Sequence, residues 1–193
     1  AYALTGAVFN PDYALNKAFA EEIGLPLDRI YPDFDTMVAE ELKRPKDERI
    51  QVFSVLTPNF LHFPMAKKLM ENGFHVICEK PMTMTHSEAL ILAQLHQEHG
   101  VHFALTHTYT GYPMVRQMKS MIADGAIGAV QKVDAQYYQG WINSIIHDQE
   151  KRQATWRLQP DKSGISCCMG DIGVHAYQML EFVTGLEVQS VLA

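Results

Sequence analysis

The sequence predicts an α/β protein whose first part is a doubly wound parallel sheet. Short apolar runs alternate with segments of helical spacing over the first half of the chain, which is typical of repeated β–α–β units. The pattern then changes, because residues 129–142 alternate polar and apolar side chains as an antiparallel strand with one buried face does. We therefore expect two domains, at residues 1–126 and 127–193.

The first elements follow from spacing and from residues that begin or end helices. Residues 2–9 are expected to form a strand, and residues 11–23 a helix capped by Asn10 and stopped by Gly24. A second helix is predicted over residues 35–43.

The next part of the chain completes the parallel sheet. Residues 50–56 are a nearly continuous apolar and β-branched run, which predicts a strand buried on both faces. Helices at 60–72 and 85–99 and strands at 74–79 and 101–106 follow.

The second half is less regular. We expect a helix over 111–128, a strand over 129–142, a long loop over 143–168, a helix over 171–183 and a strand over 187–192. Both ends of the chain look like strands caught midway, so we expect that it is part of a longer protein.

Composition limits the classes of function. A net charge of −6 without a Lys/Arg cluster argues against a nucleic-acid partner, and no apolar run reaches the ~20 residues of a membrane span. Three cysteines, of which Cys167 and Cys168 are adjacent, do not form a disulfide framework, so we expect a reducing, cytoplasmic setting.

Three polar motifs follow successive predicted strands: TPNFLH at 57–62, EKP at 79–81 and THTY at 106–109. Ligands of open parallel sheets bind at the carboxyl ends of the strands, so the three motifs are expected to line one crevice. Lys80 precedes a proline that favours an extended backbone, which would project its ammonium from a strand end toward a phosphate, hydroxyl or alkoxide. Asn59 either caps the following helix or lines the crevice, and His62 is expected to pack or cap.

The stretch MGDIGVHAYQML places Asp171 and His175 four positions apart near the start of a helix. Positions i and i+4 share a helix face, so the pair is expected to be either an acid–base couple or a capping Asp with a buried His. Both interpretations remain open at this point. A metal site with Cys167 and Cys168 is disfavoured, because the spacing of these groups suits no common metal motif, and we expect none.

These residues together resemble a known family. TPN..H, GFHVICEKP, H.Y..YP and GDIGVH are similar to motifs of the Gfo/Idh/MocA-type oxidoreductases, which include glucose–fructose oxidoreductase and inositol dehydrogenase. The resemblance implies that residues 1–126 are a Rossmann domain whose first strand and glycine-rich loop precede Ala1. It implies that residues 127–193 begin a second domain with an open, mainly antiparallel sheet. That sheet would support a homo-oligomer, a dimer or a tetramer.

The resemblance also implies a reaction: oxidation of a secondary hydroxyl of a sugar, polyol or cyclitol with NAD or NADP, or the reverse reduction. His175 would act as general acid or base, assisted by Asp171 and Lys80. The residues expected at the cofactor are Asn10, Thr57, Pro58, Asn59, His62, Glu79, Lys80 and Pro81. Those expected at the substrate are His107, Tyr109, Trp156, Arg157 and Gln178.

Two questions stay open at the level of sequence. Phe9 and Asn10 stand where NAD-specific folds usually carry an acid, which favours NADP, although no arginine follows directly to hold a 2′-phosphate. The alternatives to a dehydrogenase are the same fold using NAD transiently for glycoside cleavage or elimination, and a non-catalytic nucleotide-binding subunit.

Overall fold

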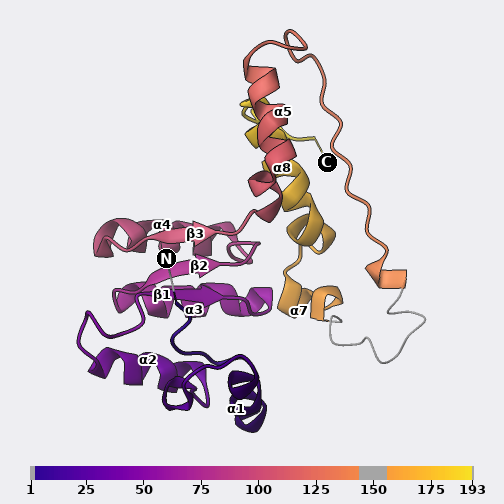
Figure 1. Ribbon diagram of the computed structural model, residues 1–193. Coiled ribbons are helices and arrows are strands. Elements are labelled where there is room, and N and C mark those ends of the chain that lie inside the picture. Colours follow the sequence, from indigo (N-terminus) through magenta and orange to yellow (C-terminus); the bar gives the residue numbers. More distant parts are fainter. Residues whose placement is uncertain (1–2, 144–155, 193) are drawn as a thin grey trace.

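The structure, a computed structural model, describes residues 3–143 and 156–192. Its centre is a parallel sheet of three strands in the order β1 (Val52–Val55), β2 (His75–Cys78) and β3 (Phe103–Leu105) (Figure 1). Val52 pairs with His75, and Val76 pairs with Phe103. The predicted parallel sheet is confirmed.

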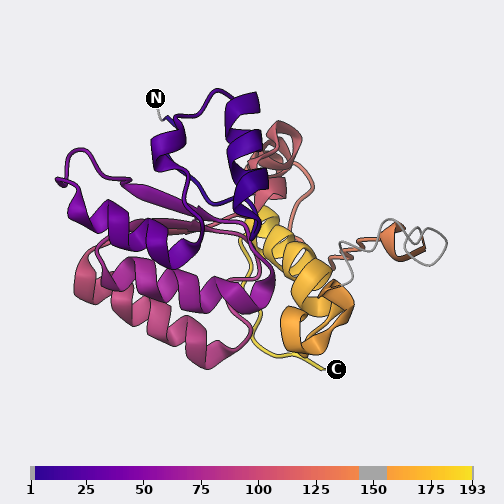
Figure 2. The same ribbon diagram turned by 90° about the horizontal axis from the view of Figure 1, so that it is seen from below.

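The main core lies on one face of this sheet. Helices α3 (His62–Glu71) and α4 (His86–His99) lie side by side there (Figure 2), over strand side chains such as Phe53 and Val76. The alternate residues Val52 and Ile77 are 46% and 38% exposed, so the expectation that residues 50–56 are buried on both faces is wrong. No element of the described residues covers that second face, and the strand therefore alternates in burial.

The amino-terminal part differs from the predicted strand and cap. Residues 3–9 form only a parallel bridge between Ala7 and Ile30, because no longer run of backbone pairs with them in the described chain; Tyr2 lies outside the described residues. Helix α1 (Tyr13–Glu22) is capped by Asp12, whose carboxylate accepts from the backbone N–H of Ala14 at 2.8 Å. The predicted cap, Asn10, lies outside the helix.

The remaining helices of this part are as expected in type and close in position. Helix α2 (Phe34–Lys43) is capped by Asp33, and α1 is followed by Gly24 with φ +72°, a left-handed conformation that favours glycine. Short 3₁₀ turns lie at Leu27–Arg29, Asn59–Leu61 (η2) and Thr108–Gly111 (η3).

A second lobe is formed by helices α5 (Pro113–Ala123) and α8 (Val174–Thr184), which pack against each other beside the sheet (Figure 1). A π-helical turn, η5 (Met169–Gly173), leads directly into α8, and the short helix α7 (Pro160–Ser163) precedes it.

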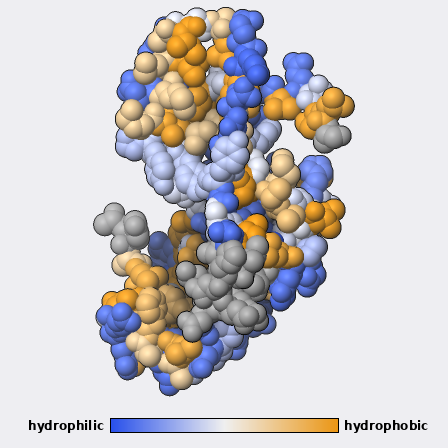
Figure 3. All heavy atoms as spheres, turned by 90° about the vertical axis from the view of Figure 1, so that its right-hand side faces the viewer, coloured by the Kyte–Doolittle hydropathy of each residue, from blue (hydrophilic) through white to orange (hydrophobic). Residues whose placement is uncertain are grey.

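The predicted strands at 129–142 and 187–192 are absent from the described residues. Residues 129–140 and 187–192 are irregular because neither run meets a backbone partner, and a strand exists only through such pairing, while residues 141–143 are helical. Part of the predicted loop at 143–168 lies outside the described residues. Apolar side chains gather on the lobe of α5 and α8 (Figure 3). No helix in the described ranges is long and apolar enough to cross a membrane.

Candidate active site

The site begins with a contact between the two lobes. Lys80 leaves the end of β2, and its Nζ donates to Asp171 Oδ1 at 2.8 Å and to the Asp171 carbonyl at 2.7 Å. Both side chains are largely buried, at 16% and 18% exposed, so this ion pair is shielded from water. Arg157 Nε lies 3.8 Å from the same carboxylate oxygen. The lysine of the EKP motif and the aspartate of the GDIGVH motif therefore meet across the two lobes.

The two loops that follow β1 and β2 are joined by a buried histidine. His62 is 1% exposed, and its Nδ1 lies 2.7 Å from the carbonyl of Pro81 while its Nε2 lies 2.8 Å from the carbonyl of Thr57. Carbonyl oxygens only accept hydrogen bonds and a neutral imidazole carries one N–H, so the ring donates to one of the two carbonyls while its other nitrogen lies beside the second. His62 packs, as expected, and its contacts hold the EKP and TPN motifs together.

Asn59 does not cap the helix that follows it. Its side-chain amide donates to the carbonyl of Ser163 at 2.9 Å, which ties the TPN loop to α7. The hydroxyl of Thr57 is buried and has no hydrogen-bond partner among the described residues. A buried hydroxyl without a partner is costly, so its presence at this edge of the sheet fits a ligand that would bind it.

Asp171 and His175 are separated by the π-helical turn. The N–H of Val174 donates to the Met169 carbonyl, five residues back, and this wider turn removes the simple i, i+4 relation on which the predicted pairing rested. No hydrogen bond joins Asp171 to His175 in the described structure. Asp171 is instead engaged by Lys80.

His175 lies among aromatic rings. Its ring centroid is 4.7 Å from that of Tyr109, 6.0 Å from that of Tyr137 and 6.3 Å from that of His107, all in edge-on arrangements. Burial lowers the pKa of His175, and the charge of Lys80 lowers it further, while Asp171 opposes the shift. The imidazole is therefore neutral near pH 7 and able to accept a proton.

Burial also lowers the pKa of His107, whose Nδ1 is a second buried atom without a partner among the described residues. The hydroxyl of Tyr109 contacts that of Tyr137, and this hydrogen bond raises the pKa of Tyr109 to about 12. Tyr109 is accordingly a neutral hydrogen-bonding group.

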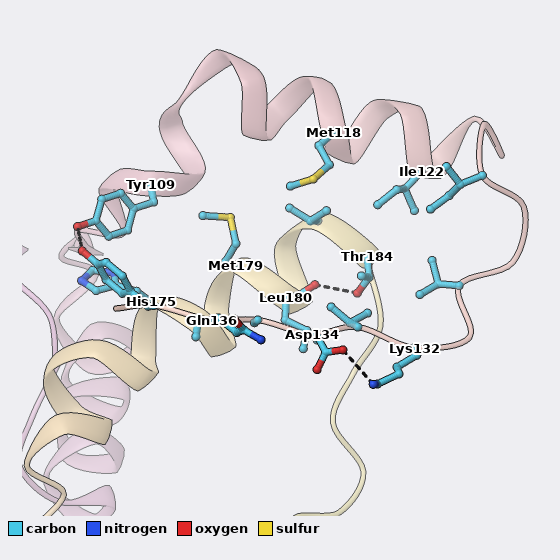
Figure 4. Close-up of a pocket in the computed structure, with 17 residues that line it drawn as sticks. Tyr109, Met118, Ile122, Lys132, Asp134, Gln136, His175, Met179, Leu180 and Thr184 are labelled. Atoms are coloured by element: carbon cyan, nitrogen blue, oxygen red, sulfur yellow. Dashed lines mark hydrogen bonds and ion pairs between the residues drawn. The ribbon is translucent and has the colours of Figure 1, made fainter. Parts of the chain in front are cut away.

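A polar hollow of about 530 Å³ lies beside Lys80, Asp171 and His175. Its walls are Glu79, Lys80, Thr108, Tyr109, Tyr112, Gln139, Trp141, Arg157, Asp171 and His175. An apolar hollow of about 570 Å³ adjoins it between α5, α8 and residues 127–137, and the two hollows share Tyr109 and His175 (Figure 4). A basic group, an acid and a neutral imidazole thus face a space large enough for a small polar molecule.

The structure brings some predicted residues together and leaves others apart. Glu79 accepts from the hydroxyl of Thr106 at 2.7 Å beside the hollow. Trp156 stacks under the Arg157 guanidinium, 4.5 Å from the ring centroid, but neither Trp156 nor Gln178 lines a hollow. Asn10 is exposed before α1, where its side chain accepts from the Asp12 N–H.

The sequence analysis missed Thr108, Tyr112, Gln139 and Trp141 of the polar hollow, and Tyr137 among the residues of the apolar one. Tyr137 and Gln139 alternate along a non-helical stretch, and this alternation was the signal that could have found them, since i and i+2 project to one side of an extended chain, whereas Trp141 lies in a helical turn. Among the described residues no group of three His, Cys, Asp or Glu side chains is arranged to hold a metal ion, and Cys167 and Cys168 are exposed.

Several known proteins are similar to this chain in sequence over most of its length. An uncharacterized oxidoreductase, YfiI, of Bacillus subtilis is 35% identical over 183 residues, which is 95% of this chain and 46% of that protein. Levoglucosan dehydrogenase of Pseudarthrobacter phenanthrenivorans is 31% identical over 72% of this chain and 34% of its own length. 2,7-Anhydro-N-acetylneuraminate hydratase of Mediterraneibacter gnavus is 30% identical over 82% of this chain and 37% of its own.

A solved structure shares the fold over nearly the whole chain. It is an inositol dehydrogenase homolog from Azotobacter vinelandii, complexed with NAD⁺, with a TM-score of 0.88 and 32% identity over 95% of this chain and 46% of that one. The chain thus spans about half the length, or less, of the relatives it matches.

Two family profiles cover the sequence. Residues 3–107 match the oxidoreductase family with an NAD-binding Rossmann fold, and residues 115–193 match the GFO/IDH/MocA C-terminal domain. The chain belongs to the GFO/IDH/MocA family of oxidoreductases.

Proposed function

We propose that the full-length protein oxidises a secondary hydroxyl of a sugar, polyol or cyclitol with NAD or NADP, or catalyses the reverse reduction. The observation that carries the proposal is the meeting of Lys80 and Asp171 beside a neutral His175 in one polar hollow. The names of two relatives, a levoglucosan dehydrogenase and an inositol dehydrogenase homolog, support the class of substrate.

The roles follow from the charges of the groups. The neutral imidazole of His175 takes the proton of the substrate hydroxyl, and the Lys80 ammonium stabilises the negative charge that develops on that oxygen. Asp171 holds the ammonium in place by accepting two of its hydrogen bonds. A nicotinamide ring, when bound, would supply the acceptor for the hydride that leaves the carbon bearing this hydroxyl.

The cofactor is proposed to lie against the ends of β1 and β2. The unpartnered hydroxyl of Thr57, at the start of the TPN motif, fits a ligand with polar groups at this edge. Of the two nicotinamide cofactors we propose NADP, because Phe9 and Asn10 supply no acid for the ribose hydroxyls of NAD.

The test is a panel of sugars, polyols and cyclitols with the full-length protein, followed by absorbance of the reduced nicotinamide. Lys80→Met and His175→Gln are each expected to lower kcat by ~10²–10⁴, the range for loss of a positioned acid–base or charged group. Lys67→Met and His86→Gln are matched controls, since both side chains lie on the surface of helices away from the hollow. Parent-like activity of either site variant would refute the assigned roles.

A second candidate is suggested by the relative named as a hydratase. A protein of this fold that oxidises its substrate only transiently would consume it without net reduced cofactor. Product analysis by mass spectrometry alongside the absorbance assay separates the two, because only a dehydrogenase both converts the substrate and accumulates reduced cofactor. A cofactor-binding subunit without turnover would neither convert the substrate nor accumulate reduced cofactor.

Two properties of the whole protein are proposed with this function. A homo-oligomer, dimer or tetramer, is expected to form through the second domain, and sedimentation of the full-length protein tests it. A cytoplasmic setting is proposed because the cysteines are free thiols, of which Cys78 is buried.

A further inference from the structure

The orientation of His175 is not set by a hydrogen bond. None joins its ring to another group in the described part of the chain, and Asp171, which sequence spacing suggested as its partner, is held by Lys80. What surrounds the imidazole is a set of aromatic rings from three separate segments: His107 after β3, Tyr109 in η3 and Tyr137 after α5. An imidazole that acts as a base must hold its nitrogen toward the hydroxyl, so these contacts take over the orienting role.

The ring nearest to His175 is Tyr109, and Tyr109 is itself held by Tyr137. Their hydroxyls are hydrogen-bonded, and their rings meet edge-on with centroids 5.6 Å apart. The Gln139 amide donates to the Tyr137 hydroxyl at 3.2 Å, which anchors this hydroxyl from the other side. Figure 4 shows Tyr109 and His175 together at one end of the apolar hollow.

We propose that Tyr137 is a positioning residue for the reaction: its hydroxyl holds Tyr109 against His175 and so keeps the imidazole ring partly shielded from water and aimed at the polar hollow. The kinetic consequence of this proposal rests on the proposed function, whereas its consequence for the position of the His175 ring does not. It adds Tyr137, from the segment after α5, to a site that Lys80 enters from the end of β2 and that Asp171 and His175 enter from η5 and α8.

The surroundings of His175 determine the sign of the expected effect. The charged and titratable groups that face it are Lys80 and Glu79 at the end of β2, His107 after β3, Asp171 in η5, and the phenols Tyr109 and Tyr137. Burial is the largest cause of its lowered pKa. Tyr137→Phe keeps a ring but frees Tyr109, so water reaches the imidazole and its pKa rises toward the ordinary value of ~6.5.

One experiment needs no turnover: an NMR titration of the His175 ring in the full-length protein. The ring signal is assigned by its disappearance in His175→Gln. Tyr137→Phe is expected to raise the titration midpoint by about half a pH unit, roughly the size of a loosened burial effect. Tyr138→Phe is the matched control: its side chain is 84% exposed and its hydroxyl contacts only Gln136. An unchanged midpoint in Tyr137→Phe, or an equal shift in Tyr138→Phe, overturns the proposal.

The kinetic arm uses the same variants with a substrate of the parent protein. For Tyr137→Phe we expect kcat/KM to fall about tenfold at pH 6.5, mostly through kcat, and its acid limb to move to higher pH, because His175 must be deprotonated to act as a base. Parent-like kinetics would overturn the catalytic part of the proposal. A parent without turnover on any substrate contradicts the proposed function instead, and the NMR result still decides the position of His175.

Discussion

His62 shows how much one buried side chain contributes to the site without reaching the hollow. Its ring lies between the carbonyls of Thr57 and Pro81 and so fixes the distance between two loops. These two residues are 24 positions apart in the sequence. The spacing TPN..H placed a histidine near the loops. It did not say which atoms the ring would contact, because these carbonyls come together only when β1 and β2 pair.

We predict that His62→Phe loosens both loops. A ring is kept, but the polar nitrogens that face the carbonyls of Thr57 and Pro81 are lost, which destabilises the fold by about 2–4 kcal/mol. Urea unfolding measures this loss, and fluorescence titration with reduced cofactor is expected to give a Kd raised about tenfold or more, as the flanking Lys80 moves. Met70→Leu, a volume-conserving change at another buried position of α3, is the control and is expected to change neither quantity strongly.

At the scale of elements, a fully buried carboxylate joins α2 to the start of β1. Glu41 accepts from Arg29 Nη2 at 2.6 Å, from the Tyr31 hydroxyl at 2.5 Å and from the backbone N–H of Ile50 at 2.7 Å. Burial alone would raise the pKa of Glu41, but these hydrogen bonds together outweigh it and lower the pKa. The carboxylate is therefore charged inside the fold and satisfied by its donors.

We predict that Glu41→Gln lowers the free energy of unfolding by about 2–4 kcal/mol at pH 7, since the charged acceptor of three donors is lost. Because the folded pKa is depressed, the stability gained from ionised Glu41 is complete above its unfolded pKa and disappears as pH falls through the folded value. The difference between parent and variant should therefore shrink below about pH 4.

Its neighbour provides the control for that measurement. Glu40 is half exposed and pairs only with Lys43 on the surface of α2, so Glu40→Gln should cost under about 0.5 kcal/mol at any pH. A loss in Glu41→Gln that is equally small, or independent of pH, contradicts the account of this buried carboxylate.

Elements were predictable where the chain itself supplies their partners. The strands near 52, 75 and 103 and the helices between them follow from apolar runs and capping residues, and the strand near 75 pairs with the other two. The stretches 129–142 and 187–192 have strand-like patterns, but pattern alone does not form a strand. Asp171 and His175 share no hydrogen bond in the described residues for a different reason: helical spacing assumes an α-helix, and η5 closes its backbone hydrogen bond five residues back instead of four.

Over the whole molecule, the site exists because two lobes meet. Among the described residues, the polar contacts that join them are those of Lys80 with Asp171, Asn59 with the Ser163 carbonyl, and Tyr109 with Tyr137. The motifs identified most of these residues from sequence, since their types are those the chemistry needs. Which residues touch across the lobes required the fold, because the partners are far apart in the chain.

We predict that Asn59→Ala weakens the contact between the lobes. Loss of the amide frees the Ser163 carbonyl and α7, so hydrogen exchange of residues 160–173 should become faster, and kcat should fall several-fold as Asp171 drifts from Lys80. Asn72→Ala, which removes a bond to the Lys68 carbonyl within α3, is the control and is expected to leave exchange in 160–173 unchanged. Parent-like exchange in Asn59→Ala contradicts the prediction.

The wide turn at Met169–Gly173 has a consequence for how such a site can diverge. It directs the aspartate to one set of neighbours and the histidine to another, so a carboxylate that steadies a cation and an imidazole that accepts a proton are tuned by different surroundings. Substitutions at Tyr109 and Tyr137 can then adjust the pKa of His175 for a new substrate while the Lys80–Asp171 ion pair stays intact. A regular helix with both groups on one face would not allow this independence.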